Sequence, residues 1–526
     1  MLSCRLFAHM SVLLLIGQAA SAQVALKPSA MRKVADVDER YVSYNVEAVE
    51  VTGGRFWKPY SKEVDELLSK PPKALGDQAI GTDPALFRYR SPIDLANPKL
   101  RKLAAALGPA YLRVSGTWRN FTYFQDDDLP SQKPPKGYNG VMTRAQWKGV
   151  VDFSKAVDAG LVTSVAISPG TRDAVGLWNA DQTRSWLDYT KKAGGKIAAT
   201  EFMNEPTFPG PGGAPEGYNA AAFARDVGVF KQFLRQESPG TVFLGPGGVG
   251  EGVSLGPAGM PLPRTISSEE ILKATGPVFD AFSYHFYGTV SKRCAAGMGP
   301  GAGIKPENAL TPEWFSKNLA VEEFYAKLRD RYLPGKDLWL TETGEAACGG
   351  DKFASEFVDS FRYTDQLGTL AQKGVKVVMQ NTLASSDYGL LDEETLNPRP
   401  NYWVALLWKR FMGTRVLDPG VAKTDAVEVF AHCARGKGGA IAVVAMNMDK
   451  TAAHSLSIPA ASERYTLTAP DLYATSLMLN GKPLEALPDG SIPAITGERV
   501  NGGAVELKPL SISFLTIDSA NNDACR

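Results

Sequence analysis

The stretch LWLTETGEAACGGDKFASEFVDSFRYTDQLGTLAQKGVKVVMQNTL, residues 338–383, contains a complete strand–helix–strand unit. Residues 338–343 and 375–383 are short apolar runs rich in β-branched side chains, which predicts two strands. Between them, residues 353–373 have the apolar spacing of an amphipathic helix. Because a crossover helix joins parallel strands, this unit predicts an α/β protein with a parallel sheet.

The same alternation extends from about Tyr41 to Gly413. Further strands are predicted at residues 42–49, 110–115, 162–168, 197–205, 242–245 and 281–287. Helical patterns occupy residues 143–159, 218–236, 311–332 and 402–411. Eight strands alternating with helices predict a closed (β/α)8 TIM barrel rather than an open doubly wound sheet.

The pattern changes after Gly413 to short alternating strands punctuated by Gly, Pro and Asn. Such strands are predicted at residues 427–432, 440–446 and 511–517. This pattern is typical of a β-sandwich, and we expect the segment 24–34 to add a strand to it. The sequence thus predicts a catalytic barrel over residues 41–413 and a β-sandwich domain made of residues 23–40 and 414–526.

The N-terminal segment has the pattern of an export signal. Arg5 precedes an apolar run at residues 12–16, and the small residues Ala20-Ser21-Ala22 precede Gln23. We therefore expect residues 1–22 to be a cleaved signal peptide, and the mature protein to be secreted or periplasmic. The apolar run is shorter than the roughly 20 residues that cross a bilayer, so no membrane anchor is expected.

The chain has almost no net charge, so long-range electrostatic attraction does not favour a polyanionic partner. Lys and Arg number 57 against 56 Asp and Glu, which gives a formal net charge of +1. Binding to nucleic acid or to an anionic membrane surface would need an excess of basic residues, so we expect neither. We also expect the protein to be a monomer.

Cysteine and histidine usage bears on disulfides and metals. Without Cys4, the mature chain keeps Cys294, Cys348, Cys433 and Cys525, which allow two disulfides in three possible pairings. Three histidines remain, and no His-Glu-x-x-His motif occurs, so no metal site is expected.

A glycine-rich motif at residues 245–250 matches the G-x-G-x-x-G pattern of dinucleotide sites. The residues that follow are rich in glycine and proline, so no helix is expected to open there. A dinucleotide site needs that helix N-terminus, and we therefore predict that the protein has no cofactor.

Two glutamates mark the ends of predicted strands. Glu205 lies in Asn204-Glu205-Pro206 after the fourth strand, and Glu342 lies in Leu340-Thr341-Glu342-Thr343 at the end of the seventh. In a (β/α)8 barrel the reacting groups come from the C-terminal ends of the strands, so these carboxylates should face one another across a cleft. A pair of carboxylates in this arrangement is what glycosidic bond cleavage requires.

The two roles follow from the chemistry of that reaction. We predict that Glu205 is the acid/base, with a raised pKa, and that Glu342 is the ionised nucleophile. Asn204 is expected to bind a sugar hydroxyl next to the reacting carbon. Glu201 and Glu345 are weaker candidates, and the two-residue period of a strand puts Glu201 on the same face as Glu205, as buried support.

Further short motifs follow one another in a characteristic order. They are Ala110-Tyr111-Leu112-Arg113 with Ser115-Gly116-Thr117, Tyr284-His285-Phe286-Tyr287, Asp387-Tyr388-Gly389-Leu390-Leu391-Asp392 and Asn401-Tyr402-Trp403. Together with the two glutamate motifs they resemble glycoside hydrolase family 79, the heparanase and β-glucuronidase family. The resemblance runs from about Tyr41 to the C-terminus.

The resemblance implies roles for individual residues. Glu205 would be the proton donor and Glu342 the nucleophile. The Tyr388 hydroxyl would contact a glucuronate carboxylate, beside a backbone donor at Ser386 where the family has glycine. Further substrate contacts are implied for Glu47, Thr117, Tyr287, Gly349 and Gly350. A disulfide between Cys433 and Cys525 is also implied, which leaves Cys294 and Cys348 as the second pair.

The activity implied by the resemblance is that of a retaining β-glucuronidase of heparanase type, acting on heparan-sulfate-like glycosaminoglycans through a covalent glycosyl-enzyme intermediate. Three alternatives stay open: an exo-β-glucuronidase on short glucuronides, an endo-glucuronidase on hyaluronan, and a non-catalytic secreted sugar-binding protein. Basic residues at Arg119, Arg264 and Lys292-Arg293 could meet flanking sulfates, although solvated surface is the expectation for scattered basic side chains.

Overall fold

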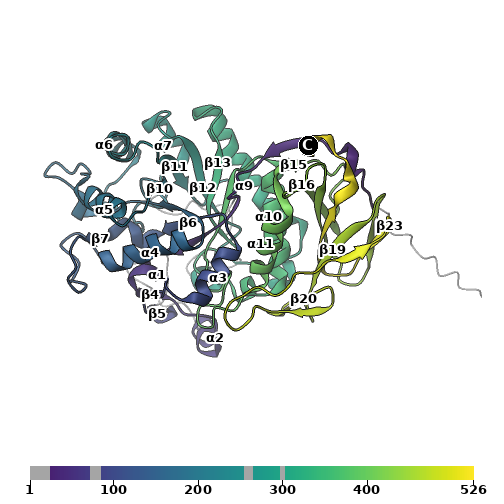
Figure 1. Cartoon of the computed structure of the whole chain (residues 1–526). Coiled ribbons are helices and arrows are strands. Elements are labelled where there is room, and N and C mark those ends of the chain that lie inside the picture. The colour runs from purple at the N-terminus through teal and green to yellow at the C-terminus, as the bar shows by residue number, and fades with distance from the viewer. Residues whose placement is uncertain (1–23, 71–83, 254–264, 296–302) are drawn as a thin grey trace, which may run out of the picture.

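The computed structural model describes residues 24–70, 84–253, 265–295 and 303–526. The predicted signal peptide at residues 1–22 and Arg264 lie outside these residues. Figure 1 shows two parts side by side: a barrel covered by helices, and a β-rich C-terminal part coloured from green to yellow. Among the described helices, none is long and apolar enough to span a bilayer.

Eight parallel strands close into a barrel, which confirms the predicted (β/α)8 fold. They are β3 (Val42–Glu47), β6 (Ala110–Ser115), β9 (Ala159–Thr163), β10 (Ile197–Thr200), β11 (Val242–Gly248), β12 (Ala281–Tyr287), β13 (Leu338–Gly344) and β14 (Val377–Gln380). Each strand pairs with the next along the chain, and β14 pairs with β3 to complete the ring. The strands are apolar and buried because helices cover the barrel's outer face.

Helices follow the strands and form the outer layer (Figure 1). They include α3 (Pro98–Ala106), α4 (Arg144–Ala156), α5 (Asp181–Lys192), α6 (Ala220–Glu237), α7 (Ser268–Thr275), α9 (Pro312–Tyr332), α10 (Phe357–Gln372) and α11 (Pro400–Phe411). Local sequence sets several of their starts: Thr143 and Gln146 form a capping box before α4, and Thr311 caps α9 ahead of Pro312. These caps satisfy backbone N–H groups that would otherwise lack partners.

The fourth strand is shorter than predicted, and this corrects one expectation. β10 ends at Thr200, and Glu205 has a left-handed φ of 51°. The side chain of Asn120 accepts a bond from the Asn204 N–H (2.9 Å) and donates to its carbonyl (3.0 Å), which takes this segment out of the strand ladder. Glu201 and Glu205 therefore do not share one face of a strand.

The C-terminal part consists of two sheets. The larger sheet contains β2 (Lys33–Asp36), β15 (Met412–Leu417), β16 (Val427–Ala434), β17 (Ile441–Asn447), β24 (Ser511–Ile517), β19 (Ser462–Thr468), β20 (Leu477–Leu479), β21 (Lys482–Leu484) and β22 (Glu498–Val500). The smaller contains β1 (Val24–Ala25), β18 (His454–Ile458) and β23 (Gly503–Leu507). Apolar side chains such as Leu417, Leu456 and Leu515 fill the space between them.

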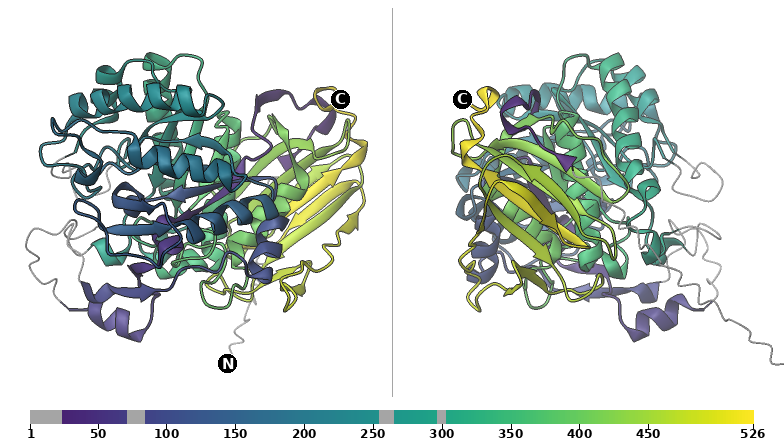
Figure 2. Two further views of the ribbon diagram at one scale, coloured as in Figure 1. Left: turned by 60° about the vertical axis from the view of Figure 1, so that its left-hand side comes forward. Right: turned by 90° about the vertical axis from the view of Figure 1, so that its right-hand side faces the viewer.

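The N-terminal segment joins this sandwich, as predicted, because β1 pairs with β18 and β2 pairs with β15. Figure 2 shows the larger sheet lying against the helices on one side of the barrel. Phe430 of β16 packs there against Gly368 of α10, where a Cβ would approach its ring to 2.3 Å. Both predicted disulfides are present: Cys433–Cys525 within the sandwich, and Cys294–Cys348 between loops of the barrel.

Candidate active site

Glu205 and Glu342 meet at the C-terminal end of the barrel. One carboxylate oxygen of each and a ring nitrogen of His285 all lie within 4.8 Å of one another. The side chains of Glu205 and Glu342 are 21% and 7% exposed. Carboxyl groups about 5–5.5 Å apart belong to retaining glycosidases, whereas inverting enzymes need about 6.5–9.5 Å to admit a water molecule. The observed separation fits retention.

Cationic and neutral donors surround Glu342. Arg113 Nη1 donates to Oε2 (2.7 Å), and the Tyr287 hydroxyl donates to Oε1 (2.7 Å). Burial alone would raise the pKa of Glu342, but the charges of His285 and Arg113 and the bond from Tyr287 outweigh it and hold this pKa below its usual value. Glu342 is therefore ionised, as a nucleophile must be.

The pKa of Glu205 is shifted the other way. Burial raises it and the negative charge of Glu342 adds to the rise, while a hydrogen bond with His285 opposes it (Nδ1 to Oε1, 3.1 Å). A carboxyl with a raised pKa keeps its proton nearer neutral pH and can deliver it to a leaving oxygen. The two environments therefore shift the pKa values of these two carboxyls in opposite directions.

His285 connects the two glutamates from inside the barrel. Its side chain is fully buried, and its Nδ1 lies 3.1 Å from Glu205 and 3.7 Å from Glu342. Burial lowers the pKa of His285 and Arg113 adds to that, but the charge of Glu342, the neighbouring Glu201 carboxylate (3.8 Å) and the hydrogen bond to Glu205 raise it to about 9. The imidazole is thus cationic at neutral pH.

Arg113 and Glu201 form a buried ion pair beneath these groups. Arg113 Nε and Nη2 donate to Glu201 Oε2 (3.1 and 2.8 Å), and Nη2 also donates to Asn204 Oδ1 (2.8 Å). Ser283 and Thr341 hydroxyls each donate to Glu201 Oε1 at 2.8 Å. Glu201 is therefore buried support, and the side-chain amide nitrogen of Asn204 remains the group that can reach a substrate.

A second group of polar side chains lies on the β3 and β14 side of the barrel mouth. Asn381, directly after β14, places its Nδ2 3.0 Å from Glu47 Oε1, 3.0 Å from the Tyr287 hydroxyl and 3.1 Å from the Tyr388 hydroxyl. Burial and the negative charge of Glu342 raise the pKa of Glu47 well above its usual range. Asn381 thus brings three of the predicted substrate contacts into one wall.

The remaining predicted contacts lie in segments that follow the barrel strands near these residues. Thr117 begins a short 3-10 helix (Thr117–Phe121) directly after Gly116, and a Cβ at Gly116 would come within 1.6 Å of Glu47 Oε2. Gly350 packs closely on Tyr388, with 3.1 Å between a Cβ placed there and the Tyr388 Cβ. Both glycines are positioned where a side chain would displace a predicted contact.

Two of the backbone amides among the implied substrate contacts, those of Ser386 and Gly350, have hydrogen-bond partners within the chain. The Ser386 N–H donates to Glu393 Oε2 (3.3 Å), and the Gly350 N–H donates to the Ala346 carbonyl (3.2 Å). Neither amide is therefore free for a substrate in this conformation. Among the described residues, the Gly349 amide has no such backbone acceptor.

Comparison with known proteins places this chain in a family. The profile described as "Glycosyl hydrolase family 79, N-terminal domain" matches residues 91–368, more than half of the chain. The chain belongs to glycoside hydrolase family 79. It is similar to heparanase from Mus musculus, with 26% identity over 85% of this chain and 90% of that protein. Baicalin-beta-D-glucuronidase from Scutellaria baicalensis is 27% identical over 66% of this chain and 63% of that protein.

The fold of this family 79 hydrolase also recurs in solved structures. The GH51 arabinofuranosidase from Xanthomonas axonopodis pv. citri superposes with a TM-score of 0.59 at 16% identity, covering 94% of this chain and 99% of that chain. At this identity the likeness concerns the fold alone. It agrees with a (β/α)8 barrel joined to a β-rich C-terminal part.

The structure adds Arg113, His285 and Asn381 to the candidate site of the family 79 enzyme. Arg113 could have been found in the sequence, because an arginine inside the apolar strand sequence AYLRVS requires a buried carboxylate partner. Asn381 directly follows the end of β14. His285 gave no such signal, since a lone histidine in an aromatic strand is as often a packing residue.

Two basic residues expected in solvent are instead buried. Arg119 is 3% exposed and its guanidinium lies 5.2 Å from the Trp186 ring centroid. Arg293 is 1% exposed and pairs with Asp387. Neither is available to flanking sulfates, and the expectation of a solvated surface is wrong for both.

The cluster of Glu205, His285 and Glu342 also has the spacing of a metal site. Arg113 argues against that use, because its guanidinium donates to Glu342 and lies 3.2 Å from His285 Nε2. A metal cation would be repelled by this adjacent positive charge. The donor set of the family 79 enzyme suits proton transfer better.

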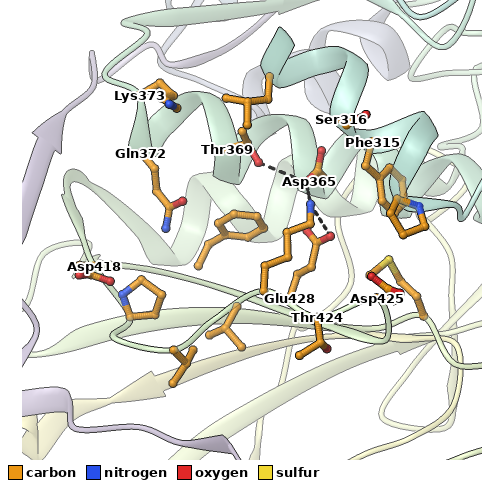
Figure 3. A pocket seen from close by; sticks show the side chains of 18 residues that line it. Phe315, Ser316, Asp365, Thr369, Gln372, Lys373, Asp418, Thr424, Asp425 and Glu428 are labelled. Atoms are coloured by element: carbon orange, nitrogen blue, oxygen red, sulfur yellow. Dashed lines mark hydrogen bonds and ion pairs between the residues drawn. The ribbon is translucent and has the colours of Figure 1, made fainter. Parts of the chain in front are cut away.

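A cavity of about 620 Å³ lies elsewhere, between α9, α10 and the sandwich (Figure 3). Lys423 Nζ bridges Asp365 (2.9 Å) and Glu428 (2.5 Å) there, and burial together with Asp365 raises the pKa of Glu428 to about 9. None of the predicted site residues lines it. The cavity belongs to the joint between barrel and sandwich rather than to the catalytic centre.

Proposed function

We propose that this family 79 hydrolase is a retaining β-glucuronidase of heparanase type, acting on glucuronic acid linkages in heparan-sulfate-like glycosaminoglycans. The observation that carries the proposal is the pair of opposite pKa shifts at Glu205 and Glu342, whose carboxylate oxygens lie within 4.8 Å. Relatives named heparanase and baicalin-beta-D-glucuronidase support glucuronide as the substrate class.

The first half of the reaction forms a covalent intermediate. A carboxylate oxygen of Glu342 attacks the anomeric carbon while Glu205 transfers its proton to the departing glycosidic oxygen. The charges of Arg113 and His285 keep Glu342 ionised beforehand. Burial keeps the proton on Glu205.

The second half returns the enzyme to its starting state. Glu205, now ionised, removes a proton from water, and the oxygen of that water attacks the anomeric carbon and releases Glu342. Two displacements at one carbon give net retention of configuration. The sugar leaves with a β-hydroxyl.

Recognition of the uronate is assigned to Tyr388. A phenol can donate a hydrogen bond to a carboxylate without bringing a charge of its own. Glu47 beside it has a raised pKa, so at neutral pH it does not repel the substrate carboxylate as an ionised group would. Asn204 and Thr117 are proposed to contact sugar hydroxyls.

The test is hydrolysis of 4-nitrophenyl β-D-glucuronide and of heparan sulfate by the wild type, Glu205→Gln and Glu342→Gln. We expect Glu205→Gln to lose about 10² to 10⁴ in kcat/KM on heparan sulfate, the usual range for a general acid, and Glu342→Gln to be inactive on both substrates. Glu428→Gln, a buried carboxyl in the distant cavity, serves as the control. Unchanged turnover in either catalytic variant would refute these two roles.

The products distinguish the alternatives. Oligosaccharides of intermediate size from heparan sulfate mean endo action on that polymer, and release of single glucuronic acid residues means an exo-enzyme. Cleavage of hyaluronan in preference to heparan sulfate would identify the other endo-activity. A folded wild type that binds these polymers without cleaving them would be a sugar-binding protein.

We also propose that the mature chain is exported and acts as a monomer with a barrel at residues 41–413 and a sandwich of residues 23–40 and 414–526. The disulfides support export, because disulfides persist in oxidising compartments. N-terminal sequencing of the protein recovered outside the cytoplasm tests cleavage after residue 22. Light scattering of that protein gives its oligomeric state.

A further inference from the structure

Arg293 lies where four segments of the barrel mouth meet. It belongs to the short helix α8 (Lys292–Ala295) after β12, and its side chain has no exposed surface. Its guanidinium pairs with Asp387 after β14, and it donates to the carbonyls of Gly350 after β13 (2.8 Å) and Lys58 after β4 (Gly54–Trp57; 2.7 Å). The Tyr60 ring centroid lies 4.1 Å from it.

The loops that follow β12 and β13 pack closely around the Arg293 guanidinium. A Cβ at Gly349 would lie 2.9 Å from Arg293 Nη1 and 2.9 Å from the Trp57 ring. The Gly349 carbonyl accepts a bond from the Asp387 N–H (3.0 Å). The neighbouring Cys294 is bonded to Cys348, so a disulfide fixes the same two loops from the next position.

These contacts lead directly to Tyr388. Asp387 precedes Tyr388 in the chain, and Gly350 packs on the Tyr388 Cβ. Arg293 thus holds Tyr388 from two sides, through the residue before it and through the loop that packs on it. By contrast, none of the hydrogen bonds or ion pairs of Arg293 among the described residues reaches Glu205, Glu342 or His285.

We propose that Arg293 is a positioning residue that determines the preference for a uronate by fixing the Tyr388 loop. The inference rests on the proposed glucuronidase activity and on the assignment of Tyr388 to the substrate carboxylate. Arg293 does not bind the carboxylate itself, because its side chain is enclosed and its charge is paired with Asp387. Its own contacts do not reach Glu205 or Glu342, and Arg113 bonds Glu342 instead, so we expect its effect on KM rather than on kcat.

The test compares Arg293→Lys and Arg293→Met with the wild type on 4-nitrophenyl β-D-glucuronide and 4-nitrophenyl β-D-glucoside. A lysine cannot reproduce the planar fork that reaches Asp387 and the carbonyls together. We expect KM for the glucuronide to rise about tenfold in Arg293→Lys and further in Arg293→Met, with kcat changed less than about threefold. Any turnover of the neutral glucoside should change little.

Arg172→Lys is the matched control. Arg172 is also a buried cation with one carboxylate partner, Asp226, one carbonyl partner, Ile167 (2.7 Å), and one aromatic neighbour, Tyr218 (5.4 Å). It lies after β9, away from Tyr388. We expect its replacement to lower thermal stability without changing KM for the glucuronide.

The outcomes separate the alternatives. A fall in kcat at unchanged KM, or an unchanged KM in a folded Arg293 variant, would overturn the positioning role. If Arg293→Met does not fold, Arg293→Lys and Asp387→Asn decide, because Asp387→Asn removes the same ion pair and should give the same split between KM and kcat. Lack of glucuronide hydrolysis by the wild type would instead reject the proposed function, before any variant is made.

Discussion

Replacing His285 by glutamine should move the pH profile of the enzyme to higher pH. The imidazole is buried, with a pKa raised to about 9, so the wild type carries a positive charge between the two glutamates at neutral pH. That charge helps to lower the pKa of Glu342, and its hydrogen bond opposes the rise in the pKa of Glu205. Glutamine removes the charge and leaves a side chain of similar reach.

The magnitude follows from the distance of 3.7 Å between His285 Nδ1 and Glu342 Oε2. Two unit charges about 4 Å apart interact with about 4 kcal/mol at an effective dielectric constant near 20. This equals about three pKa units at about 1.4 kcal/mol each, and it is an upper bound. Arg113 still donates to Glu342 in the variant, so we expect a shift of about one to two units.

The sign is the same for both limbs of the profile. Loss of the charge raises the pKa of Glu342, so the ascending limb, where the nucleophile ionises, moves to higher pH. Loss of the same charge also raises the pKa of Glu205, so the descending limb, where the proposed acid loses its proton, moves in the same direction. The assay is kcat/KM for 4-nitrophenyl β-D-glucuronide measured from acid to alkaline pH.

His432→Gln is the control for this experiment. His432 is as buried as His285 but lies in the sandwich, where burial lowers its pKa to about 4 and leaves it neutral. We expect its replacement to leave both limbs in place. An ascending limb that does not move in a folded His285→Gln variant would mean that the charge of His285 does not lower the pKa of Glu342.

Three further predictions follow from the same contacts. The kcat/KM of the wild type should show a bell-shaped pH profile, with its acid limb below the usual carboxyl pKa because the pKa of Glu342 is lowered, and its alkaline limb above it because the pKa of Glu205 is raised. A profile with only one limb would contradict this. Tyr388→Phe should raise KM for a glucuronide about tenfold while a neutral glucoside is unaffected, since one hydrogen bond to a charged group is lost; steady-state kinetics on both substrates measure it. Replacing both Cys433 and Cys525 by serine should lower the free energy of unfolding by up to about 4–5 kcal/mol, because the bond closes 92 residues; urea unfolding measures it, and an unchanged midpoint would show that the loop gains no stability from this bond.

Much of the fold was predictable because its determinants are local. The strands at residues 110–115, 281–287 and 511–517 have the predicted bounds, since their apolar runs end at clear turn signals. The positions of Glu205 and Glu342 near the barrel rim also followed from counting strands, because parallel strands present their C-terminal ends together.

Other features could not be read from a local pattern. Glu205 lies beyond its strand because Asn120, far away in the sequence, bonds the backbone of Asn204. The amides of Ser386 and Gly350 looked available, but Glu393 and Ala346 accept from them.

The sequence by itself determined the barrel, the two catalytic candidates and the four cysteines that pair, because periodicity and residue type are properties of a segment. Only the tertiary structure decided that Arg113 and His285 control the charge on Glu342, and that Arg293 is enclosed beneath the Tyr388 loop. The physical reason is that burial and electrostatic interaction depend on distances between segments, and folding sets those distances by bringing together strand ends and loops that are far apart along the chain.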